Sequence, residues 1–140
     1  MASFLPVYLD SSAIVKLVVE EPETGALIAA LDRWPDRVSA ALARVEVHRA
    51  LRRHGRPKSV HAKADAVLDS LVLIRLDDGL LSQAASFSKP DMRSLDAIHL
   101  AAALSIGDDP DALITYDVRL ARAAAAEGLN VLHPGATLEF

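Results

Sequence analysis

The stretch "VYLDSSAIVKL", residues 7–17, places an aspartate directly after a run of strand-forming residues and directly before an apolar helix. The same order recurs in "LITYDVRLARAA", residues 113–124, in which Asp117 ends the apolar strand. Strands that lead straight into helices are typical of a parallel sheet. The functional crevice of such a sheet lies beyond the carboxyl ends of its strands. If these two strands are neighbours, Asp10 and Asp117 therefore meet at one rim.

The rest of the chain continues the alternation of strands and helices. Strands are predicted at residues 5–9, 71–75, 113–116 and 130–132, with a weaker candidate at 37–39. Helices are predicted at residues 12–19, 23–34, 40–53, 59–70, 79–87, 94–106 and 118–127, with a turn at 107–111. This order predicts an α/β fold, a three-layer α/β/α sandwich with a central parallel sheet of four to five strands. No repeat or linker interrupts it, so residues 1–140 are expected to form a single domain.

The composition narrows the classes of function. Hydrophobic residues make up 51% of the chain and charged residues 24%, which is typical of a globular protein. The absence of cysteine excludes disulfides, thiolate catalysis and zinc sites with cysteine ligands. No apolar run approaches the roughly 18 residues that span a bilayer, and no signal peptide is evident. The sequence therefore predicts a cytoplasmic protein with no membrane segment.

The charge is unevenly distributed along the chain. The formal net charge is −4, yet seven of the fifteen lysines and arginines lie between Arg44 and Lys63, where Glu46 is the only acid. A run of this kind is most often a solvated helix face, although a basic stripe can also bind phosphates.

Asp10 and Asp117 each have a structural and a functional interpretation. Aspartate is a favoured helix N-cap because its side chain accepts a backbone N–H bond. Ser11 and Ser12 are equally good caps, which leaves Asp10 free for another role. Asp117 could likewise cap the helix that starts at Val118.

Two further acids lie on predicted helices. Glu46 is placed in mid-helix in "SAALARVEVHRAL", residues 39–51, among apolar neighbours, and is expected to be a half-buried carboxylate that needs a partner. The alternative is an exposed glutamate paired with Arg49 or Arg53.

Asp96 follows the expected N-cap Ser94 in "SLDAIHLAAAL", residues 94–104, where the helix dipole favours a negative charge. Because the rest of that helix is almost wholly apolar, its first-turn acid is expected to point into the protein or a cleft. His99 on the same helix is interpreted as an interior histidine with its hydrogen bonds satisfied.

The four acids together favour a metal site. Carboxylates that converge in one crevice repel each other, and a divalent cation removes that cost. Oxygen-only ligands suit Mg²⁺, with Mn²⁺ as the alternative, and such an ion activates water and stabilises charge on a phosphodiester. We therefore expect Mg²⁺ or Mn²⁺ as the cofactor.

The stretches quoted above resemble the four acidic motifs of PIN domains, and in particular those of the VapC toxins of type II toxin–antitoxin pairs. The resemblance extends to the last strand, through "LITYDVRLARAAAAEGLNVLHP", residues 113–134. It implies a metal-dependent ribonuclease that hydrolyses RNA and inhibits translation. By motif, it implies catalytic roles for Asp10, Glu46, Asp96 and Asp117, with Asp10 and Asp96 as metal ligands.

The resemblance also implies partners. These are an RNA substrate, a cognate VapB-like antitoxin and a second copy of the chain in a homodimer. With an acidic site, RNA must be attracted from elsewhere, so the basic segment becomes a candidate phosphate-binding surface. Its candidate contacts are Arg44, Arg49, Arg52 and Arg53.

Two other functions remain open from the sequence. One is a non-catalytic PIN-like module that binds a partner and whose acids are vestigial. The other is a phosphoryl-accepting receiver domain that uses Asp10 or Asp117. The receiver domain is disfavoured because it lacks paired acids near one strand end, and Lys16 is the only lysine near them.

Overall fold

The computed structural model describes residues 4–106 and 110–139, and over these residues it contains a five-stranded sheet in the order β3-β2-β1-β4-β5. Each strand runs parallel to its neighbour. The strands are β1 (Val7–Leu9), β2 (Arg37–Ala40), β3 (Val72–Ile74), β4 (Ala112–Ile114) and β5 (Val131–Leu132). The helices are α1 (Ser11–Val18), α2 (Thr24–Leu31), α3 (Ala43–Arg53), α4 (Lys58–Asp69), α5 (Asp78–Ala85), α6 (Ser94–Leu104) and α7 (Val118–Ala126).

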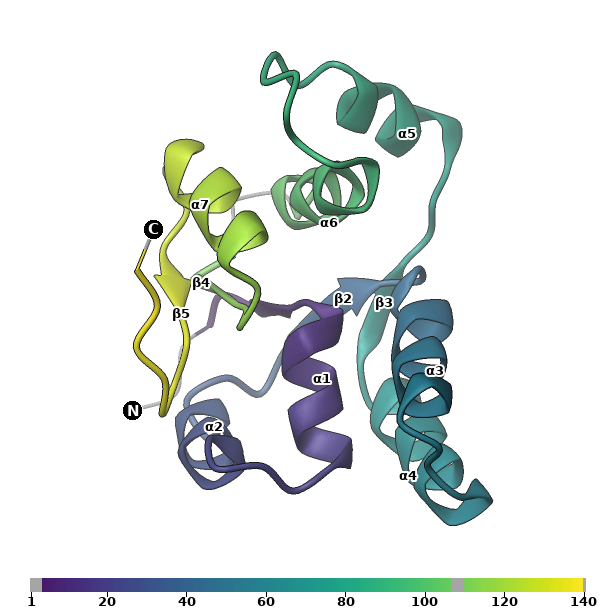
Figure 1. The fold of residues 1–140 in the computed structure, drawn as a ribbon. Coiled ribbons are helices and arrows are strands. Elements are labelled where there is room, and N and C mark those ends of the chain that lie inside the picture. Colours follow the sequence, from purple (N-terminus) through teal and green to yellow (C-terminus); the bar gives the residue numbers. More distant parts are fainter. Residues whose placement is uncertain (1–3, 107–109, 140) are drawn as a thin grey trace.

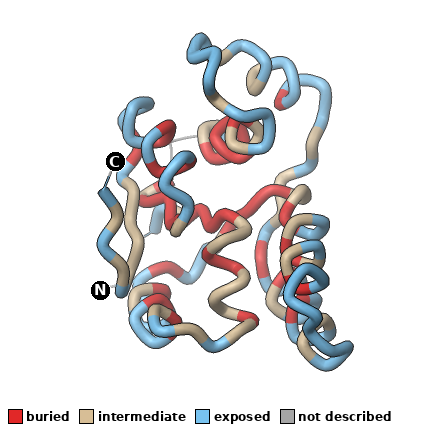
Figure 2. The backbone as a smooth tube through the Cα atoms, viewed as in Figure 1, coloured by how far each residue is buried: buried red, intermediate tan, exposed pale blue. Residues whose placement is uncertain are grey.

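The sheet is covered on both faces, with α1 to α4 on one side and α5 to α7 on the other (Figure 1). Side chains of a strand alternate between its two faces, and this alternation divides the core into two clusters. Val7 and Leu9 of β1 pack with α1 to α4, whereas Tyr8 packs with α6 and α7. Figure 2 shows the buried residues running along the sheet and the helix faces turned toward it. The predicted three-layer sandwich with a parallel central sheet is confirmed.

Most predicted elements are present, with shifted ends. The predicted helix at residues 40–53 is wrong at its start, because Ala40 belongs to β2 and the Ala41 N–H donates to the Ile74 carbonyl of β3 at 2.8 Å. The first strand begins at Val7 rather than at residue 5, in keeping with Pro6, which has no N–H to donate. Residues 107–109 of the predicted turn lie outside the described residues.

The two strands that end in aspartates are neighbours, which is the condition that the sequence analysis set for Asp10 and Asp117 to meet at one rim. Leu9 of β1 is in register with Ile114 of β4, and the Asp10 N–H donates to the Ile114 carbonyl at 3.2 Å. The chain then leaves β1 for α1 on one face and leaves β4 for α7 on the other (Figure 1). Such a divergence of connections is where α/β sheets open a crevice for a ligand. Across the residues that are described, the structure has no helix long and apolar enough to cross a membrane.

Candidate active site

Asp10 lies directly after the carboxyl end of β1, and its carboxylate is held by three donors. Only 4% of the residue is exposed. Its Oδ1 accepts from the Ala13 N–H at 3.0 Å and from the Ser12 hydroxyl at 2.7 Å, and its Oδ2 accepts from the Thr115 hydroxyl at 2.6 Å. The prediction that Ser11 or Ser12 caps the helix is wrong, because Asp10 itself caps α1 through Ala13. One carboxylate can cap with one oxygen and still present the other to the site, so the two interpretations of Asp10 do not compete.

Burial makes the negative charge on Asp10 costly. Desolvation raises its pKa, and this effect outweighs the charge of His99 and the bonds from Thr115, Ser12 and Ala13. A cation beside the carboxylate would reverse that balance, because opposite charge favours the ionised form.

Glu46 is brought to the same crevice by α3. Its side chain is 22% exposed, and its Oε1 accepts from the Ser11 hydroxyl at 2.6 Å and from His99 Nε2 at 2.6 Å. The expected half-buried carboxylate with a partner is confirmed, and the pairing with Arg49 or Arg53 is not found. Because α3 begins at Ala43, Glu46 lies in the first turn and not in mid-helix as predicted. Burial opposes its charge, but the bond and charge of His99 and the bond from Ser11 hold the pKa of Glu46 below its usual value.

His99 is the functional residue whose role the sequence reasoning missed. It is buried and has both ring nitrogens bonded, as expected of an interior histidine, but one of its partners is Glu46. The other is the buried Tyr8 hydroxyl, 2.7 Å from Nδ1. Burial alone would lower the pKa of His99, but the bond to Glu46 and the charges of Asp10, Glu46 and Asp96 raise it. The sequence places His99 three residues after Asp96, and so on the same helix face, but it carries no local signal for the contact with Glu46.

Asp96 lies in the first turn of α6, as predicted, and is partly buried. Desolvation and the nearby charge of Asp117 raise its pKa, against the opposing charges of His99 and Arg119. The prediction that Ser94 is the N-cap is wrong. Ser94 is the first helical residue, and Arg93 occupies the cap position with no side-chain cap bond.

Asp117 is exposed and caps α7, the structural role that the sequence left open. Its Oδ1 accepts from the Arg119 N–H at 2.9 Å. Its own N–H donates to the Thr115 hydroxyl at 3.0 Å, and Thr115 in turn donates to Asp10. Thr115 therefore connects the ends of β1 and β4.

The four acids are electrostatically connected, but they do not form a ready-made metal cage. The charges of Asp10, Glu46 and Asp96 all act on His99, and that of Asp117 acts on Asp96. In the described parts of the chain, however, no three histidine or acidic side chains are grouped so that they could hold an ion. The donor chemistry still fits Mg²⁺ or Mn²⁺, because Mg²⁺ keeps several waters and uses one or two carboxylates with substrate phosphates.

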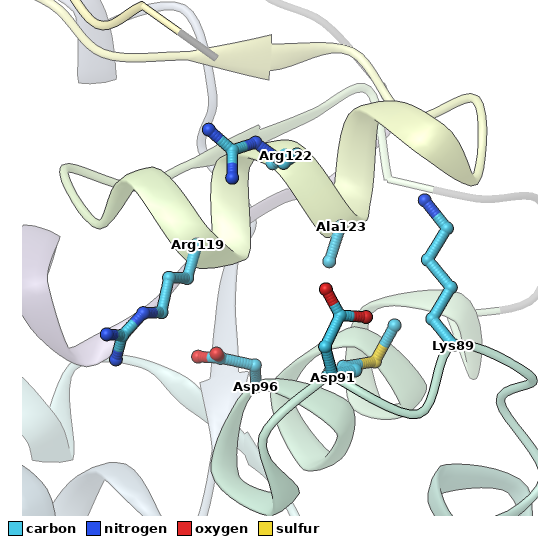
Figure 3. Close-up of a pocket in the computed structure, with 7 residues that line it drawn as sticks. Lys89, Asp91, Asp96, Arg119, Arg122 and Ala123 are labelled. Atoms are coloured by element: carbon cyan, nitrogen blue, oxygen red, sulfur yellow. The ribbon is translucent and has the colours of Figure 1, made fainter.

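Two hollows border the acids. One, of about 350 Å³, is lined by Ser11, Ser12, Val15, Lys16, Glu21, Glu46, Ala50, Arg53 and Tyr116. The other, of about 90 Å³, lies between α7 and the segment that leads into α6. It is lined by Lys89, Asp91, Met92 and Asp96 and by the α7 residues Arg119, Arg122 and Ala123. Figure 3 shows the Arg119 side chain extending from α7 on the side on which the Asp96 carboxylate lies. Glu46 and Asp96 thus each line a recess that also contains basic groups.

The comparisons with known proteins identify the family. The model of the PIN domain matches residues 7–126. The chain is a PIN domain of the VapC family. It is 46% identical over 128 residues to "Ribonuclease VapC46" of Mycobacterium tuberculosis, covering 91% of this chain and 97% of the relative. It is 37% identical over 134 residues to "Ribonuclease VapC47" of the same species, covering 93% and 98%.

The fold of this PIN domain also matches a solved structure. The crystal structure of M. tuberculosis VapC20, described as a "Sarcin-Ricin loop cleaving toxin", superposes with a TM-score of 0.71 at 16% identity. The match covers 91% of this chain and 99% of that one. At this identity the likeness establishes the fold alone.

The predicted basic surface of this PIN domain is only partly free. Arg44 is paired with Asp69 of α4, with 2.9 Å between the guanidinium and the carboxylate. Arg49, Arg52 and Arg53 are exposed. Of these, Arg53 lines the larger hollow together with Glu46, so basic charge reaches the acids from the α3 side.

Proposed function

We propose that this PIN domain is a metal-dependent endoribonuclease that acts as the toxin of a type II toxin–antitoxin pair. The observation that carries the proposal is Asp10, a buried carboxylate at the β1–β4 strand ends whose charge the protein alone does not favour. The family membership and the ribonuclease names of its relatives support the same conclusion.

Asp10 and Asp96 would hold the ion, which we propose to be Mg²⁺, with Mn²⁺ as a substitute. When bound, such an ion activates water and stabilises charge on the phosphodiester. Asp10 presents Oδ2 while Oδ1 caps α1, so its position is fixed by the helix it starts. The pKa values of both aspartates are raised, so a bound cation would stabilise their ionised forms.

Glu46 and Asp117 would complete the site. Among the described residues, Glu46 Oε2 has no hydrogen-bond partner, since both bonds go to Oε1. Oε2 is therefore able to accept a bond from the attacking water and orient it. Asp117, exposed at the same rim, adds negative charge close to Asp96.

The RNA backbone would be held by basic groups on either side of the acids. Arg49, Arg52 and Arg53 of α3 supply exposed positive charge on one side, and Arg119 of α7 supplies it on the other. Contacts to phosphate give affinity and salt dependence without selecting a base sequence. A VapB-like antitoxin and a homodimer are further parts of this proposal.

The test is cleavage of labelled total RNA by the purified protein with Mg²⁺, with EDTA, and with Mg²⁺ restored. We expect cleavage that EDTA abolishes and Mg²⁺ restores, and loss of cleavage in Asp10→Asn and Asp96→Asn. The matched control is Asp78→Asn, which removes an exposed acid of α5 and is expected to cleave normally. Cleavage undiminished in EDTA would refute the metal mechanism.

Expression in cells tests the toxin role. Wild type is expected to arrest growth, and the arrest should be relieved by Asp10→Ala, by Asp96→Ala and by co-expression of the product of an adjacent antitoxin gene. If wild type and both variants leave growth and RNA equally untouched, the alternative of a non-catalytic partner-binding module is favoured.

A further inference from the structure

A chain of hydrogen bonds that includes Glu46 joins residues of β1, α1, α3 and α6. Tyr8 of β1 bonds His99 Nδ1 at 2.7 Å, and His99 Nε2 of α6 bonds Glu46 Oε1 of α3 at 2.6 Å. Ser11 at the start of α1 donates to the same Oε1 at 2.6 Å. These residues are up to 91 positions apart in sequence, so the chain exists only in the folded protein.

The direction of the central bond follows from the chemistry of its ends. An ionised carboxylate only accepts hydrogen bonds, and the pKa of Glu46 is lowered, so His99 Nε2 is the donor. Nδ1 then either accepts from the Tyr8 hydroxyl or, in the charged imidazole, donates to it. In both cases the donor that faces Glu46 is the same.

The packing around His99 leaves the ring little freedom to move. The residue is 4% exposed, and its ring meets that of Tyr8 edge-on, with centroids 5.9 Å apart and an angle of 78° between the planes. Tyr8 is itself fully buried. Nε2 is therefore fixed relative to α6, and through it relative to Asp96 one turn earlier on that helix.

Glu46 receives both of these bonds on one oxygen. With Oε1 held by His99 and Ser11, the carboxylate cannot rotate without breaking a bond from a buried donor, which is costly. Among the described residues its Oε2 is unbonded. The arrangement thus fixes one oxygen and leaves the other free for a ligand.

We propose that His99 is a positioning residue, which holds the Glu46 carboxylate in the orientation that the metal ion and its water require. This inference rests on the proposed function, because Glu46 must act in the metal site for its orientation to matter. Partners that orient a metal-site carboxylate are worth about 10- to 100-fold in metal affinity or activity. His99 itself touches neither the ion nor the RNA.

Two substitutions of His99 separate its two bonds. In His99→Gln the side-chain amide reaches the position of Nε2 and keeps a donor for Glu46. In His99→Asn the shorter amide reaches only the position of Nδ1, so it keeps a partner for Tyr8 and loses Glu46. Both variants bury an amide of similar polarity, so each is the control for the other.

The measurement is direct binding of Mn²⁺ to the RNA-free protein, followed by electron paramagnetic resonance, with RNA cleavage measured in parallel. We expect His99→Gln to bind Mn²⁺ within about threefold of wild type and His99→Asn to bind about tenfold more weakly or worse. Cleavage is expected to follow the same order. A histidine that only fills the core would show no such rescue by Gln.

Equal Mn²⁺ affinity in the two variants would overturn the inference, and so would weaker binding by His99→Gln than by His99→Asn. If neither variant folds, Ser11→Ala removes the second donor to Oε1 at a partly exposed position and leaves the bond from His99 in place. Mn²⁺ affinity within about threefold of wild type is then expected, and a loss of about tenfold or more would overturn the inference, because the orientation of Glu46 would depend on Ser11.

Mn²⁺ binding and RNA cleavage by the wild type alone show whether the proposed function fails. A wild type that binds Mn²⁺ but leaves RNA intact refutes the ribonuclease, while the affinities of the variants still decide the role of His99. A wild type that binds no Mn²⁺ removes both the metal mechanism and this inference.

Discussion

Replacing Asp10 by asparagine should remove most of the stabilisation that the metal ion gives the folded protein. The change removes a buried charge and keeps the shape of the side chain. Asparagine Oδ1 can retain the bonds from the Ala13 N–H and the Ser12 hydroxyl, so the cap of α1 is preserved. The amide nitrogen then faces Thr115, whose hydroxyl donates to Asp10 in the wild type and must turn to accept.

The size of the effect follows from these contacts. One hydrogen bond is disturbed, at a cost of about 1 kcal/mol. The buried charge that raises the pKa of Asp10 is removed, which acts in the opposite direction. In EDTA the variant should therefore unfold within about 1 kcal/mol of wild type.

With the metal ion present, wild type and Asp10→Asn should differ in stability. An ion present at about 100 times its Kd should stabilise wild type by about 2.7 kcal/mol. For a chain of this size that is a rise in Tm of about 10 °C. Asp10→Asn is expected to show little of this rise because it has lost a ligand.

The assay is urea and thermal unfolding followed by the fluorescence of the single tryptophan, the buried Trp34, with and without Mn²⁺. Asp78→Asn is again the matched control and should respond to the ion as wild type does. A loss of more than about 3 kcal/mol by Asp10→Asn in EDTA would refute the electrostatic reasoning. An unchanged response to Mn²⁺ would show that Asp10 is not a ligand.

Three further outcomes are expected. Leu100→Ala, which empties a fully buried position on α6, should lower the free energy of unfolding by about 2–5 kcal/mol in urea titrations. Replacing Arg52 and Arg53 by glutamine should weaken RNA binding in EDTA and reduce the slope of log K against log salt by about 1.4, measured by fluorescence anisotropy. In metal-free protein, the raised pKa of His99 gives stability that is complete below pH 6.5 and is lost as pH rises through the folded-state value. The free energy of unfolding of wild type, relative to that of His99→Gln, should therefore fall as pH rises through the folded-state pKa of His99. The lowered pKa of Glu46 gives stability that is present above pH 4.5 and is lost as pH falls through its folded-state value. Urea titrations of wild type and His99→Gln across pH check both changes in stability. The same dependence of the free energy of unfolding on pH in the two proteins would contradict them.

The sequence predicted the layers of the fold because the determining signals are local. Apolar strands of three or four residues followed by helices indicate a parallel sheet without any knowledge of contacts. The end of β2 could not be located in this way, because Ala41 is held by a bond to Ile74 in a distant strand. The same error moved Glu46 from the first turn of α3 to mid-helix.

The sequence singled out the four acids of the candidate site, but it did not predict the hydrogen bonds that connect the site residues. Asp10 was set against Ser11 and Ser12 as a competing cap, whereas the carboxylate caps α1 and is bonded by Ser12 at the same time. His99 was placed correctly in the interior, but its contact with Glu46 depends on the packing of α6 against β2 and on α3 starting at the same end of the sheet. Pairings of that kind are set by tertiary structure, and a single sequence carries no local signal for them.

The bond between Thr115 and Asp10 has a consequence for synthesis of the chain. Its two ends are 105 residues apart, and Asp117 is tethered to the same hydroxyl. A nascent chain has the local donors of Asp10, Ser12 and Ala13, from the start, but it lacks Thr115 until β4 has been made. The acids are therefore assembled only after β4 has been made. No activity that needs all four acids can arise in the nascent chain before β4 has emerged from the ribosome.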